Sequence, residues 1–122
     1  PMVCRDIADN YEMDLNTVYA CTKGTSKHVG ASFTEPGFVN GIFELLHEIA
    51  GGEANWRKRP FVSNSNCFVV PPMKFAVESC QVMEECVRGG MPVLLLSAGQ
   101  AGATAPAPIA GAIVLDFDIT FS

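Results

Sequence analysis

The chain has 122 residues, of which 48% are hydrophobic and 17% charged, and its formal net charge is −5. This length corresponds to about one domain, and the apolar fraction excludes a disordered chain. A negative chain argues against a nucleic-acid partner, which selects for a basic face, and no apolar run is long enough for a membrane span.

The first predicted unit is a strand followed by a helix. Residues 27–33, "KHVGASF", read as a strand, and "NTVYACT" at 16–22 reads as an earlier one. Thr34 is expected to cap the following helix, Pro36 to occupy its first turn and Gly51 to end it. The apolar positions at helical spacing are Phe38, Ile42, Leu45, Leu46 and Ile49, which predicts a face that packs in the core.

Two further units repeat this order. A strand within residues 60–70 precedes a helix that Gly89 ends, and a strand at 92–98 precedes a helix that begins near Pro106 or Pro108. The expected core stripe of the second helix is Met73, Val77, Cys80, Met83 and Val87.

Strands that alternate with helices indicate an α/β fold with parallel pairing. The apolar run "PVLLL" at 92–96 predicts a strand covered on both faces. Two architectures remain open: part of a (β/α)8 barrel, or a small flavodoxin-like sheet, although the chain is short for both. Residues 115–121 alternate between apolar and polar side chains, which predicts a strand in place of a continuing helix.

The cysteines favour a reducing compartment. There are five, no two have the spacing C-x-x-C, and the N-terminal segment lacks the apolar core of a secretory signal. We therefore expect free thiols and a cytoplasmic location. The chain has two histidines, His28 and His47, and no cysteine is spaced to join them in a zinc site, so no metal is expected.

The predicted strands end in uncharged polar residues, and ligands of α/β folds bind at the carboxyl ends of strands. The second strand carries "SNSNC" at 63–67, which could equally be a loop that satisfies its own backbone. The loop that begins "SAGQAGATAPAP" at residue 97 matches neither the P-loop nor the dinucleotide-binding glycine pattern, and it contains no charged side chain. A nucleophile–base pair of Cys67 and His28 is conceivable, but we expect these two side chains to lie apart.

Three segments resemble one family. "DLNTVYACTKGTSKHVGASF", "IAGGEANWRKRPFVSNSNCFVVPPMKF" and "GGMPVLLLSAGQAGATAPAPIAGAIV" are similar to the trimethylamine methyltransferase family. The resemblance covers residues 14–114 and stops before a divergent tail at 115–122. It implies that residues 1–122 form a single α/β unit, an internal portion of a (β/α)8 barrel with about three βα units, completed by self-association.

The resemblance also implies a function. Members of this family transfer a methyl group from trimethylamine, or from a quaternary amine such as glycine betaine, to a corrinoid protein. This chain would then bind no cofactor itself, and the corrinoid would be carried by the partner protein. The residues expected to face the amine are Asn64, Asn66, Gln100, Thr104 and Phe33. Two alternatives stay open: a non-catalytic truncated oligomer, and a small-ligand-binding α/β module.

Overall fold

The computed structural model describes residues 3–70, 74–97 and 99–121. Its elements, in chain order, are α1 (Asn10–Gly24), β1 (Val29–Ala31), the 3-10 helix η1 (Pro36–Phe38), α2 (Val39–Ala50), α3 (Glu53–Lys58), β2 (Val62–Val70), β3 (Lys74–Phe75), α4 (Val77–Arg88), β4 (Val93–Ser97) and α5 (Ile109–Phe121).

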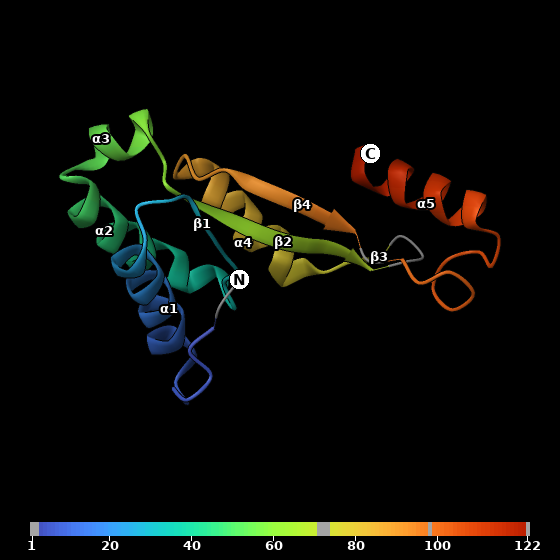
Figure 1. Cartoon of the computed structure of the whole chain (residues 1–122), viewed down its shortest axis with the longest axis horizontal. Helices are drawn as coiled ribbons and strands as arrows, with labels where there is room; N and C mark the ends of the chain where they lie inside the picture. The colour runs from blue at the N-terminus through green and yellow to red at the C-terminus, as the bar shows by residue number, and fades with distance from the viewer. Residues whose placement is uncertain (1–2, 71–73, 98, 122) are drawn as a thin grey trace.

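Three parallel strands form the sheet in the order β1–β2–β4. Val29 lies opposite Val62, and Asn64 lies opposite Val93. The short β3 pairs antiparallel with the end of β2. Figure 1 shows α1, α2 and α3 at one end of the molecule and α5 at the other, beyond the carboxyl ends of β2 and β4. The predicted mixed α/β fold with parallel pairing is confirmed.

The main core lies between the sheet and α1 to α4. In β1, Val29 and Ala31 are buried while Gly30 is exposed, so this strand turns one face to the helices. Trp56 of α3 is fully buried and its indole N–H donates to the Gly89 carbonyl at 3.0 Å. The buried residues of this core are Val18, Val29, Ala31, Val39, Ile42, Phe43, Leu46, Trp56, Val62, Val82, Cys86 and Met91.

The strand predicted at residues 16–22 is wrong, because this segment belongs to α1. The Asp9 carboxylate caps the helix by accepting a hydrogen bond from the Glu12 amide at 2.9 Å. Asp14, Thr17 and Val18 are buried and lie at helical spacing, so the buried face includes two polar residues that hide the helical pattern.

The start of the next helix also differs from the prediction, whereas its end does not. Thr34 does not cap a helix: its amide and hydroxyl both donate to the buried Asp14 carboxylate, at 2.9 and 3.0 Å. Pro36 begins η1, and α2 follows directly. Gly51 ends α2 with φ +76°, a conformation that favours glycine, as predicted. The expected start of the last helix near Pro108 is confirmed, since α5 begins at Ile109.

The buried face of α4 differs from the predicted stripe. Val77 and Val87 are 64% and 61% exposed, whereas Val82 and Cys86 are buried. The helix is turned so that this i, i+4 pair meets the core between α2 and the sheet. Met73 of the predicted stripe lies outside the described residues.

Two predictions about the third unit are wrong. Residues 115–121 are helical and continue α5, because the segment contains no glycine or proline that would stop a helix already begun at Ile109. Strand β4 is not covered on both faces: its consecutive leucines, Leu94, Leu95 and Leu96, are 54%, 39% and 42% exposed. Within the described residues β4 pairs with β2 alone, so it lies at the edge of the sheet.

Candidate functional site

A hollow of about 520 Å³ lies along the sheet, next to the carboxyl end of β1 and the middle of β2 and β4. Residues that follow β1, residues of β2 and β4, and one residue of α4 form its wall. They are Ser32, Phe33, Asn64, Ser65, Asn66, Cys67, Ser79, Leu94 and Leu96. Three of the five residues expected to face a ligand, Phe33, Asn64 and Asn66, therefore come together here.

Strand β2 sends its side chains in two directions. Asn64 and Asn66 are buried on the side of the helices, since the Asn66 amide group donates to the Ser79 carbonyl of α4 at 2.6 Å. Ser65 and Cys67 alternate with them and are more exposed. The "SNSNC" segment is thus part of a strand and not a loop that satisfies its own backbone. The expectation that it ends the strand is wrong, because β2 continues to Val70.

Asn64 differs from Asn66 in having an unmatched donor. Its side chain is 1% exposed, and its Nδ2 atom has no hydrogen-bond partner among the described residues. A buried amide donor without a partner costs about 1–3 kcal/mol, so native proteins contain few of them. The unmatched donor beside a hollow marks Asn64 as the residue best placed to meet a ligand.

The other side of the strand is built from small side chains. The Ser32 hydroxyl donates to the Ser65 carbonyl at 2.9 Å and so joins the end of β1 to β2. Leu94 and Leu96 lie opposite Ser65 and Cys67 in the pairing with β4. Paired residues of parallel strands point to the same side, so these leucines add an apolar wall next to the serine and the thiol.

The wall of the hollow contains no charged side chain. Among the described residues, no group of three His, Cys, Asp or Glu side chains could hold a metal ion. Cys67 lines this hollow, whereas His28 precedes β1 at the opposite end of the sheet, so they form no nucleophile–base pair. The arrangement suits a ligand held by hydroxyl, carboxamide and apolar contacts, without proton transfer to a carboxylate or imidazole.

Gln100 and Thr104 lie elsewhere, in the turn between β4 and α5. The Thr104 hydroxyl oxygen accepts a hydrogen bond from the Gln100 amide at 3.0 Å. The Gln100 carbonyl accepts from the amides of Ala103, Thr104 and Ala105. Both side chains are exposed and neither lines the hollow that contains Asn64.

Three residues of the wall were not expected from the sequence: Ser79, Leu94 and Leu96. Ser79 lies beside the hollow because α4 packs against β2, and no local sequence pattern predicts that contact. The two leucines follow from the register of β4 against β2. The apolar run of the third strand was visible in the sequence, but its pairing partner was not.

None of the helices within the described residues is long and apolar enough to cross a membrane.

The sequence matches the family described as Trimethylamine methyltransferase (MTTB) over residues 1–117. It is 30% identical over 115 residues to trimethylamine methyltransferase MttB1 of Methanosarcina mazei, covering 93% of this chain and 23% of that protein. It is 33% identical over 90 residues to trimethylamine methyltransferase MttB of Desulfitobacterium hafniense, covering 74% of this chain and 18% of that protein. The chain thus spans less than a quarter of these relatives, and it belongs to the trimethylamine methyltransferase family.

Proposed function

We propose that the chain forms part of a methyltransferase that removes a methyl group from a methylated amine, either trimethylamine or a quaternary amine. The named activity of the relatives supports this reaction class. The chain covers 23% of the first of them, so the proposal concerns a portion of the substrate site.

The observation that carries the proposal is the unmatched, buried Nδ2 donor of Asn64, a residue that borders a hollow without charged side chains. When the C–N bond of an ammonium breaks, the bonding electrons stay on nitrogen, and a neutral amine with a lone pair departs. Such a leaving group needs no proton from a general acid. It does need to be held in one orientation, and an N–H group can donate a hydrogen bond to its new lone pair.

The other residues of the hollow have complementary tasks in this proposal. Phe33 provides apolar surface for the methyl groups, and its ring can also attract an ammonium cation. Leu94 and Leu96 lie on the other face of the sheet from the Asn64 side chain, so they border the hollow without sharing that contact. The Asn66 side chain already donates a hydrogen bond to the Ser79 carbonyl of α4, so in this proposal it positions β2 and does not contact the substrate. Gln100 and Thr104 stay candidates for a more distant contact because their turn follows the carboxyl end of β4.

The methyl acceptor is proposed to be a corrinoid carried by a partner protein, which supplies the nucleophile. The uncharged polar and apolar lining of the hollow supports a role in holding the amine, and the corrinoid is proposed to be held by the partner.

We also propose that β1, β2 and β4 are successive strands of a (β/α)8 barrel. The parallel order β1–β2–β4, with a helix after each strand, supports this arrangement. The exposed leucines of β4 support it as well, because the two faces of a barrel strand are covered by the barrel interior and by an outer helix. A cytoplasmic location is proposed on the basis of the free thiols of Cys4, Cys21, Cys67, Cys80 and Cys86.

The proposal is tested in a full-length family member that carries this segment. Replacing the asparagine at the position of Asn64 with alanine is expected to lower kcat/KM for the amine about tenfold or more, because the donor to the leaving nitrogen is lost. The rate is measured from the absorbance change of the corrinoid protein on methylation, and thermal unfolding checks that the variant is folded.

The matched control is Asn55→Ala, which removes an exposed asparagine whose amide donates to the Gly51 carbonyl. We expect this variant to keep the wild-type rate. An Asn64→Ala variant that folds and retains wild-type kcat/KM would remove Asn64 from the substrate site.

A further inference from the structure

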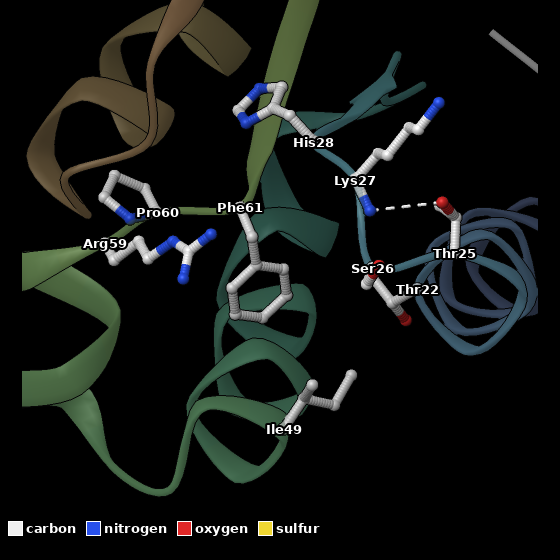
Figure 2. A pocket seen from close by; sticks show the side chains of 9 residues that line it. All are labelled: Thr22, Thr25, Ser26, Lys27, His28, Ile49, Arg59, Pro60 and Phe61. Atoms are coloured by element: carbon white, nitrogen blue, oxygen red, sulfur yellow. Dashed lines mark hydrogen bonds between the residues drawn. The ribbon is translucent and has the colours of Figure 1, made fainter.

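A second hollow, of about 280 Å³, lies at the opposite end of the sheet, before the amino ends of β1 and β2. Figure 2 shows its side chains, which come from the end of α1, the turn before β1, the last turn of α2 and the residues before β2. The lining residues fall into three kinds: the basic Lys27, His28 and Arg59, the hydroxyl-bearing Thr22, Thr25 and Ser26, and the apolar Ile49, Pro60 and Phe61.

The lining is basic without a compensating acid. No Asp or Glu lines this hollow, although the chain carries 13 acidic and 8 basic residues. Arg57 and Arg88 are each paired with a glutamate one helical turn earlier. Lys27 and Arg59 have no ion pair within the described part of the chain. Positive charge is therefore concentrated in one place on a protein that is negative overall.

The same hollow offers hydrogen-bond donors and an apolar wall. The Thr25 hydroxyl oxygen accepts the Lys27 amide at 3.1 Å, which leaves its O–H free to donate outward. Figure 2 shows the Arg59 guanidinium beside Phe61, and Lys27 on the other side of Phe61 with its ammonium group extending away from the ring. An anionic group near Arg59 would then leave the rest of the molecule next to the Phe61 ring and Ile49.

We propose that this hollow binds a small organic oxyanion, a carboxylate or a phosphate ester with a short apolar part. Arg59 provides the planar donor fork that such groups favour, Lys27 adds a flexible second charge, and Ser26 and Thr25 supply hydroxyl donors. The site is separate from the proposed methyl-transfer site, because the two hollows share no residue and lie at opposite ends of β1.

A purely structural role for the cations is the competing explanation. The last turns of α1 and α2 border the hollow, and helix C-termini attract positive charge through their unpaired carbonyls. That role predicts a loss of stability when Arg59 is changed, but it predicts no saturable binding of an anion. The two explanations therefore differ in a measurable way.

The test is a titration of the isotope-labelled 122-residue chain with inorganic phosphate and, separately, with benzoate, followed by NMR at constant ionic strength. We expect saturable shifts of the amides of Lys27, His28 and Phe61. Arg59→Gln should raise the dissociation constant about tenfold or more, since it removes a charge-assisted hydrogen bond. Arg57→Gln, two residues away and engaged with Glu53, is the matched control and should bind as the wild type does.

Tighter binding of benzoate would assign the site to carboxylates with an apolar group, and tighter binding of phosphate would assign it to phosphate esters. Shifts that do not saturate in the millimolar range would overturn the proposal, as would equal weakening by Arg57→Gln and Arg59→Gln. Lys27→Gln provides a second variant if Arg59→Gln does not fold, and it should also weaken binding.

Discussion

Asn64 and Asn66 are two residues apart on one strand, yet their side chains are in different situations. Asn66 donates to the Ser79 carbonyl, whereas the Nδ2 donor of Asn64 has no partner among the described residues. A buried donor without a partner destabilises the fold, so a residue that carries one is a better candidate for ligand binding than a residue whose hydrogen bonds are complete. The contrast predicts opposite effects for the same substitution at the two positions.

Asn64→Leu is expected to raise the free energy of unfolding by about 1–2 kcal/mol, because an unmatched buried donor is replaced by an apolar group beside a hollow with room for it. Asn66→Leu is expected to lower it by about 1 kcal/mol, because the bond to Ser79 is lost. Urea unfolding of both variants and the wild type measures the difference. A destabilisation by both substitutions would contradict the assignment of Asn64 as an unsatisfied residue.

At the scale of elements, α4 connects the core to the sheet through Val82 and Cys86. Burial, which is the larger cause, and the neighbouring Glu85 carboxylate together raise the pKa of the Cys86 thiol from 9.0 to about 12. In the unfolded chain this thiol ionises near pH 9, so between pH 9 and about 12 the unfolded state holds fewer protons than the folded state. Stability contributed by the neutral thiol must therefore fall as the pH rises through this interval.

We expect the wild-type chain to lose about 1.4 kcal/mol more than Cys86→Ala when the pH is raised from neutral to 10. The comparison uses urea unfolding of both proteins at each pH. Every other ionisable group is present in both proteins, so its contribution to the pH dependence cancels in the difference. The alanine variant begins from lower stability because it leaves a cavity, but its pH dependence should be shallower. If the free energy of unfolding depended on pH in the same way in both proteins, Cys86 would not be the group that ionises on unfolding.

The whole molecule has an exposed apolar edge at β4. Leu94, Leu95 and Leu96 are all partly exposed, and strands with an unpaired edge tend to pair with other chains. The chain spans 23% of the length of the Methanosarcina mazei relative, so the neighbours of β4 in such a protein would come from other residues. In the isolated chain we propose that a second copy of the same chain covers this edge.

The isolated chain is expected to sediment as a dimer or larger species, and Leu94→Lys is expected to shift it toward the monomer. A lysine on the edge adds a charge that must be desolvated when strands pair. Val77→Lys, at a 64% exposed position on α4, is the control and should leave the assembly unchanged. A wild-type monomer in sedimentation velocity at all concentrations would contradict the prediction, and dissociation by both lysines would point to association through apolar surface in general.

Several features could be predicted from local signals. The alternation of strands and helices indicated parallel pairing, Gly51 marked the end of α2, and Pro108 marked the start of α5. These predictions succeed because glycine and proline restrict the backbone wherever they occur. The polar segment 63–67 likewise pointed to Asn64 and Asn66, which border the hollow, although the structure places them inside β2 and not at its carboxyl end.

The sequence by itself therefore determined the order and type of most elements, the family and the strand that carries the polar residues. Only the tertiary structure decided that residues 16–22 and 115–121 are helical, which face of α4 is buried, and that Gln100 and Thr104 lie outside the hollow. The apolar residues of short segments such as these fit both a helical and a strand repeat, so packing against the rest of the chain decides between helix and strand. The unmatched donor of Asn64 could also be found only in the tertiary structure, because the lack of a hydrogen-bond partner depends on the surrounding residues and not on the asparagine itself.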